Sequence, residues 1–302
     1  MSAAHSDPTT GEWAGNHSPV VVGVDGSERN RSAVEWAANE AARTGAGLVL
    51  STVVEDDTPR HSLHSVSTVR QHARTMLEGI AKEAGRTVPA EQVSVEVVTG
   101  SPDAELATHF PAARMIVLGK RGLGAISRVL VGSTSLAVAG RAESAVAIIP
   151  DTWIPQGHDA LPVVVGVDPY RTHGQLLHLA FRRAERLDVP LVAVHGWETP
   201  TAALMGGPAV DGSVAQWQAE SEAEFDRVVE TWQKRFASVR LEAVKSSLHP
   251  ATAVLDAGEH AQLVILGRHS NSRFTGLAFG SVTRAVLHYA TCPVLVVPTD
   301  QP

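Results

Sequence analysis

The stretch that decides the fold is PVVVGVD, which this chain of 302 residues contains twice, at Pro19–Asp25 and at Pro162–Asp168. Four of its seven residues are valine, and the apolar run has no polar alternation. A run of this kind is typical of a parallel strand whose two faces are both covered by helices. Its exact recurrence predicts that the chain is a duplicated α/β domain.

The remainder of the chain repeats in step with this stretch. MIVLG at Met115–Gly119 returns as LVILG at Leu263–Gly267, and SAVAIIP at Ser144–Pro150 corresponds to CPVLVVP at Cys292–Pro298. The copies are 143 residues apart at the first pair and 148 apart at the later ones. The difference of five residues must therefore lie in a connection between elements.

Short β-branched runs alternate with helical patterns in both halves, as in βα units that build a parallel sheet. We expect an α/β fold with two tandem, open-twisted, five-stranded parallel sheets and helices on both faces of each. The expected strands are 19–25, 47–54, 93–98, 114–118 and 145–149, then 162–168, 190–196, 240–245, 263–266 and 293–297. The expected helices are 29–44, 64–86, 102–110 and 132–142, then 173–187, 214–238, 250–258 and 280–290.

The domain organisation follows from these elements. Polar residues 1–18 form a predicted disordered tail, residues 19–150 and 162–298 the two domains, residues 151–161 a Pro- and Gly-bearing linker, and residues 299–302 a second tail. We expect the two halves to pair within the chain through the strands Ala145–Ile149 and Pro293–Val297, because an exposed sheet edge seeks a partner. A homodimer of whole chains stays open.

Composition narrows the class of protein. Hydrophobic residues make up 44% and charged residues 19%, which excludes a disordered chain. The net charge is −7 without a long basic run, so nucleic acid is not an expected partner. No apolar run approaches the length of a membrane span. With one cysteine, Cys292, and no secretory signal, we expect a cytoplasmic protein and read Cys292 as a packed small residue.

The stretch GKRGLGAISRVLVGSTS, at Gly119–Ser135, carries the chemistry of the first half. Glycines can adopt positive φ and let backbone N–H groups approach an anion, and the N-terminus of a helix attracts phosphate. The loop therefore predicts a phosphate site. Its glycines are Gly119, Gly122 and Gly124, its cations Lys120 and Arg121, and its helix start Gly132, Ser133 and Thr134. The alternative is an ordinary Gly-rich turn followed by a helix cap.

The spacing of Gly119, Gly122, Gly132 and Ser133 matches G-x2-G-x9-G-[S/T], and Asp25 follows the first strand. With these motifs the chain resembles the ATP-binding universal stress proteins of the tandem type, over nearly its whole length. The resemblance implies a Rossmann-like fold and a bound ATP. It places Asp25 at the adenine or ribose, Gly23 beside the nucleotide, the Val53 backbone at the adenine edge, and the Gly119–Gly124 and Gly132–Thr134 segments around ribose and phosphates. It also implies Mg²⁺ or Mn²⁺ on the phosphates, without a protein side-chain ligand. Asp25 can equally serve as a turn residue before the first helix.

The second half departs from this pattern in GRHSNSRFTGLAFGS, at Gly267–Ser281. Its matching positions are Gly166, Asp168, Gly267, Arg268, Gly280 and Ser281. Ser270 replaces the second glycine, and Pro169 and Tyr170 follow Asp168, so a backbone donor is lost and a bulky side chain is gained. We expect this second adenine-nucleotide site to be weaker than the first, or empty.

Two functions remain open from the sequence. The resemblance favours a nucleotide-dependent regulatory protein of stress tolerance. The alternative is a slow ATPase or another enzyme that uses adenine nucleotides. The stretch Gly119–Ser135 contains no Asp, Glu or His to orient a water molecule, so no catalytic residue is assigned and the regulatory reading leads.

Overall fold

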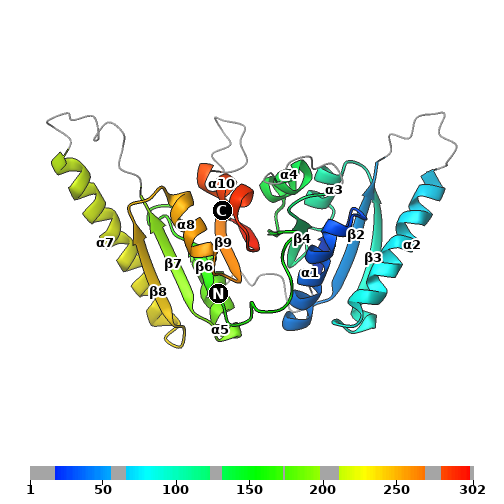
Figure 1. The fold of residues 1–302 in the computed structure, drawn as a ribbon, viewed down its shortest axis with the longest axis horizontal. Helices are drawn as coiled ribbons and strands as arrows, with labels where there is room; N and C mark the ends of the chain where they lie inside the picture. The colour runs from blue at the N-terminus through cyan, green and yellow to red at the C-terminus, as the bar shows by residue number, and fades with distance from the viewer. Residues whose placement is uncertain are drawn as a thin grey trace, which may run out of the picture.

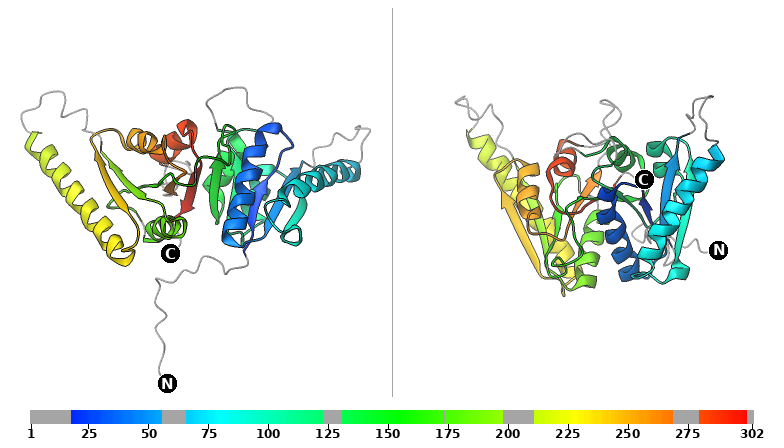
Figure 2. Two further views of the ribbon diagram at one scale, coloured as in Figure 1. Left: turned by 60° about the horizontal axis from the view of Figure 1, so that its bottom comes forward. Right: turned by 45° about the vertical axis from the view of Figure 1, so that its right-hand side comes forward.

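The computed structural model describes residues 18–55, 66–122, 131–172, 174–197, 211–268 and 280–299. These residues form one sheet of ten strands in the order β3-β2-β1-β4-β5-β10-β9-β6-β7-β8. Figures 1 and 2 show the two halves meeting in the middle of this sheet, with α2 and α7 at opposite ends of the molecule.

The first half contains five strands and four α-helices, which are β1 Val20–Gly23, α1 Arg31–Thr44, β2 Leu48–Val54, α2 Val66–Ala84, β3 Val93–Thr99, α3 Pro102–Thr108, β4 Met115–Gly119, α4 Ser133–Arg141 and β5 Ala145–Ile149. The second half contains β6 Val163–Gly166, α5 Gly174–Leu187, β7 Leu191–Gly196, α7 Asp211–Arg235, β8 Leu241–Ser246, α8 Pro250–Gly258, β9 Leu263–Arg268, α10 Ser281–Tyr289 and β10 Val294–Pro298. Every expected strand and helix is present, with ends shifted by a few residues.

The valine runs form the centre of each half. β1 lies between β2 and β4, and β6 lies between β7 and β9, all in parallel. Val20 and Val22 point into the layer that holds α1 and α2, whereas Val21 points into the layer that holds α3 and α4. This alternation of a continuous apolar strand between two helical layers is why no polar residue interrupts VVV.

The two five-stranded sheets join at β5 and β10, which pair antiparallel. The expected pairing of the two halves within the chain is confirmed. Ala147 pairs with Leu295, its own counterpart 148 residues further along the chain, so a pseudo-twofold axis passes between these two residues.

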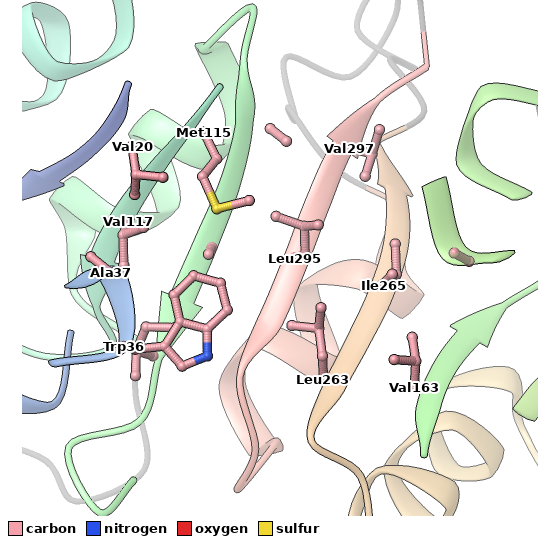
Figure 3. Close-up of a cluster of buried hydrophobic side chains, with 14 of the residues drawn as sticks. Val20, Trp36, Ala37, Met115, Val117, Val163, Leu263, Ile265, Leu295 and Val297 are labelled. Carbon is pink, nitrogen blue, oxygen red and sulfur yellow. The ribbon is translucent and has the colours of Figure 1, made fainter. Parts of the chain in front are cut away.

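The hydrophobic core crosses this seam without interruption. Figure 3 shows Met115 and Trp36 of the first half facing Leu295 of the second half, with Ile265 and Val163 beyond it. All five side chains belong to one buried cluster. Among the helices of the described residues, none combines the length and the apolar character needed to cross a membrane.

Candidate functional site

Asp25 and the glycine loop meet at the carboxyl edge of the first sheet. Asp25 follows β1, and Gly119 ends the neighbouring strand β4. A Cβ atom on Gly122 would collide with Oδ2 of Asp25, so only glycine allows this approach. The structure thus brings together the acidic residue and the loop that the sequence analysis combined into one site.

The other oxygen of Asp25 is used locally. Its Oδ1 accepts hydrogen bonds from the Ser27 backbone N–H at 2.9 Å and from the Ser27 hydroxyl at 2.7 Å. Gly26 stands between them at φ 79°. Asp25 therefore holds the turn before α1 with one oxygen and faces Gly122 with the other, so the two alternatives for this residue coexist.

Two hydrogen bonds join the ends of the loop. The Ser135 hydroxyl donates to the Gly119 carbonyl at 2.8 Å, and the Gly132 N–H donates to the Lys120 carbonyl at 2.8 Å. The loop start and the first turn of α4 are thereby held side by side. Gly132 is the N-cap residue and has no side chain to bond the N–H groups of that turn, in which Ser133 is exposed and Thr134 partly buried.

The glycines of this edge serve close packing. Gly119, Gly122 and Gly132 are not among the positive-φ residues, so the expectation that the loop glycines supply left-handed backbone is wrong for these three. A Cβ on Gly119 would lie 3.2 Å from the Arg121 carbonyl oxygen and 3.4 Å from the Asn30 amide nitrogen, so small size is what this position requires. Gly124 lies outside the described residues.

Gly23 and Gly166, the last residues of β1 and β6, face apolar side chains. A Cβ on Gly23 would lie 2.5 Å from Leu118, and a Cβ on Gly166 would lie 2.6 Å from Leu266. Both positions are thus filled by the equivalent leucine of the adjacent strand. Val53, near the end of β2, is partly buried against the same helical layer.

The two basic residues that follow Gly119 and Gly267 cross the seam between the halves. Lys120 Nζ donates to the carbonyl of Ala290 at the end of α10, at 2.8 Å. Arg268, the counterpart of Lys120, donates to the carbonyl of Ala142 at the end of α4, at 2.8 Å, and to Ala139 at 3.1 Å. Cations at the C-terminus of a helix bond its free carbonyl groups. Each half thus caps a helix of the other half.

Burial governs the protonation of this region. It lowers the pKa of the Lys120 ammonium to about 8, and the neighbouring Arg121 guanidinium lowers it further, while Asp151 opposes the change. Arg121 forms an ion pair with Asp151. Burial also raises the pKa of the Cys292 thiol to about 12, which makes a nucleophilic thiolate unfavourable.

The second half keeps the loop closure and changes the strand end. The Thr283 hydroxyl donates to the Gly267 carbonyl at 3.2 Å, as Ser135 does to Gly119. Asp168 accepts from the Tyr170 backbone N–H at 3.1 Å, and the Tyr170 ring is exposed. Gly280 and Ser281 begin α10 as Gly132 and Ser133 begin α4. Ser270 lies outside the described residues.

Sequence reasoning missed a cavity of about 450 Å³. It lies in the crevice between α1 and α2 and reaches Gly26 and Ser27, but it includes none of the loop glycines. Asn30 lines it, and its amide nitrogen donates to the Gly23 carbonyl at 3.1 Å. Within the described ranges no group of three or more His, Cys, Asp or Glu side chains is arranged to hold a metal ion.

Comparisons with known proteins agree with this architecture. The model of the universal stress protein family matches the chain twice, over residues 17–150 and 161–298. Universal stress protein Rv1996 of Mycobacterium tuberculosis is 32% identical over 305 residues, covering 93% of this chain and 96% of the relative. Universal stress protein Rv2005c of the same organism is 34% identical over 287 residues, covering 92% and 96%.

Among solved structures, a universal stress protein from Archaeoglobus fulgidus matches 95% of this chain and 99% of its own, with a TM-score of 0.67 and 18% identity. That similarity shows the shared fold. Because the family model accounts for both halves, and relatives above 30% identity align over nearly their whole length, the chain belongs to the universal stress protein family, with two such domains in one polypeptide.

Proposed function

We propose that the chain binds ATP in its first half and acts as a nucleotide-dependent regulator of stress tolerance. The observation that carries this proposal is the contact between Asp25 and Gly122 in a loop with the G-x2-G-x9-G-S spacing. A carboxylate suited to ribose or adenine hydrogen bonds then lies at one end, and the uncapped first turn of α4 lies at the other, where phosphate is favoured.

The proposed contacts follow from this placement. Asp25 and the Val53 backbone meet the adenine and ribose, while Gly119, Gly122, Gly124 and the Gly132–Thr134 turn surround the phosphates. Lys120 is bonded to Ala290 and Arg121 to Asp151. These two cations therefore contribute charge from the rim of the site. Mg²⁺ or Mn²⁺ would bind through the phosphate oxygens.

The second half offers a weaker site in this proposal. Asp168, Gly267, Gly280 and Ser281 occupy the matching places, whereas Arg268 is bonded to α4. Gly166 packs on Leu266 and would border the nucleotide only through its backbone. Pro169 lacks one backbone donor that the first half has at Gly26.

A substitution at Gly132 tests the proposal. A Cβ there would have ordinary contacts, 3.8 Å to the Lys120 carbonyl oxygen and 3.9 Å to the Ser135 hydroxyl, so Gly132→Asp should fold. Its carboxylate would repel the phosphates, and we expect at least a tenfold loss of ATP affinity by calorimetry in the presence of Mg²⁺, or ~1.4 kcal/mol. Gly79→Asp adds the same charge on the exposed face of α2 and should bind ATP like the unaltered protein.

The same samples decide between regulator and enzyme. Phosphate release from ATP should stay far below multiple turnovers per minute in the unaltered protein. Sustained release that Gly132→Asp abolishes would instead assign a slow ATPase to this site. Undiminished ATP binding by Gly132→Asp would reject the site.

A further inference from the structure

The crevice between α1 and α2 holds a cavity of about 450 Å³, within the size range of small-molecule sites. Its apolar wall is formed by one face of each helix, and its rim carries two cations and two carboxylates. The apolar residues are Val34, Ala38, Ile80 and Ala84, and the charged residues are Arg31, Glu35, Glu83 and Arg86.

The duplication shows what the same crevice holds in the other half. Ala38 corresponds to Phe181 at the spacing of 143 residues, and Ala84 corresponds to Trp232 at the spacing of 148. The second spacing is supported by equivalent backbone hydrogen bonds, from Val88 to Ala84 at 3.0 Å and from Phe236 to Trp232 at 3.1 Å. Three aromatic residues of the second half thus stand where the first half has two alanines and a valine.

In the second half these rings fill the crevice between α5 and α7. The Phe181 ring centroid lies 5.3 Å from that of Phe236 and 6.3 Å from that of Trp232, and both pairs are stacked with interplanar angles of 24°. Phe181 is completely buried. The fold therefore closes this crevice with stacked aromatic rings when the residues supply them.

In the first half the corresponding space remains open although the surrounding core is well packed. Leu77 below it is fully buried, and Trp36 on the other side of α1 is 2% exposed. Interiors are normally packed to high density, and unfilled volume costs stability. A space that has the outline of stacked rings, and that one copy of the fold fills while the other leaves accessible, is suited to a planar ring supplied from outside.

A polar group lies at the end of the cavity near Gly26. Asn30 is 5% exposed, and within the described residues its Oδ1 has no hydrogen-bond partner, although its amide nitrogen is bonded to Gly23. A buried acceptor without a donor is costly, and a ligand N–H can satisfy it. The four rim charges cancel, so neither a strong anion nor a strong cation is favoured.

We propose that the α1–α2 cavity is a binding site for a small, planar aromatic molecule that carries an N–H donor and has no net charge. The ring occupies the space between Ala38 and Ala84, and the donor faces Asn30. The site is separate from the proposed ATP site, because none of the loop glycines borders it.

The probe for this site is 5-fluoroindole, followed by its ¹⁹F NMR signal on addition of the full-length protein. We expect saturable broadening with the unaltered protein and none with Ala84→Trp, which supplies the residue of the second half. Ala104→Trp, on the exposed surface of α3 on the opposite face of the sheet, is the matched control and should bind the probe normally. Ala38→Leu is a smaller obstruction that should also abolish binding if Ala84→Trp folds poorly.

Two further measurements separate this proposal from the first. Gly132→Asp should keep fluoroindole binding, and Ala84→Trp should keep ATP binding. Displacement of fluoroindole by ATP, or an unbroadened signal with the unaltered protein, would overturn the aromatic site. Undiminished broadening with a folded Ala84→Trp would overturn it as well.

Discussion

Glu40 Oε1 lies 2.5 Å from a guanidinium nitrogen of Arg183, and the two residues occupy equivalent positions in α1 and α5, 143 residues apart. Their side chains are 2% and 12% exposed, and the guanidinium also lies 5.9 Å from the centroid of the Trp36 ring. Under the pseudo-twofold relation an identical pair of halves would place like charges face to face. The divergence of one position to Glu and the other to Arg removes that repulsion.

Charge reversal at this pair is expected to destabilise the protein. Burial alone would raise the pKa of Glu40, but Arg183 outweighs it, and the pKa of Glu40 is lowered. Arg183→Glu should therefore cost about 3–5 kcal/mol in urea unfolding, because it leaves two buried carboxylates without a cation. The swapped double variant Glu40→Arg/Arg183→Glu should recover part of this loss. A double variant no more stable than the sum of the single changes predicts would contradict the direct pairing.

The buried ammonium of Lys120 predicts a pH dependence. Its pKa is about 8 in the folded state and ordinarily 10.5, so between these values the unfolded chain holds more protons. Stability then rises with pH across this window, by at most about 3 kcal/mol at 1.36 kcal/mol per pKa unit. The difference in unfolding free energy between the unaltered protein and Lys120→Met should grow from pH 8 to pH 10.5. A difference that stays constant would show that burial does not perturb this lysine.

The two candidate nucleotide sites should respond unequally to the same substitution. A Cβ on Gly280 meets nothing within 4 Å, so Gly280→Asp is tolerated sterically, as is Gly132→Asp. We expect Gly132→Asp to remove most of the co-purified nucleotide and Gly280→Asp to remove little, measured as nucleotide per chain after denaturation. Equal losses in the two variants would reject the inequality of the halves.

Removal of an aromatic ring from the second half should be costly. Phe181 packs between Trp232 and Phe236 with no exposed surface, so Phe181→Ala should destabilise the protein by about 3–5 kcal/mol in denaturant unfolding. The opposite change, Ala38→Phe, fills space that is already open and should cost far less. Similar losses in both variants would mean that the first-half crevice cannot accommodate a ring.

The order of elements was predictable because each half carries strong period signals. The valine runs at Val20–Gly23 and Val163–Gly166 can only be central parallel strands, and the equal spacing from Gly119 to Pro150 and from Gly267 to Pro298 fixes the last βα unit of each half. The proximity of Asp25 to the loop followed from the rule that carboxyl ends of adjacent parallel strands share one edge.

Side-chain destinations across the seam were not predictable in this way. Lys120 and Arg268 look like phosphate ligands in the sequence, but both point toward the opposite half, which is set by how β5 meets β10. The α1–α2 cavity was missed for a related reason. It depends on the contrast between Ala38 and Phe181 and between Ala84 and Trp232, which appears only when helices of two different spacings are brought into register.

The antiparallel contact between β5 and β10 has a consequence for assembly. Since both strands belong to one polypeptide, each meets the other at a fixed effective concentration, which the linker maintains at any dilution. Two separate domains joined by the same contact would come apart as they became scarce, whereas this chain retains the contact even when only a few copies are present. A cell can therefore hold the protein at low abundance and still have every molecule assembled.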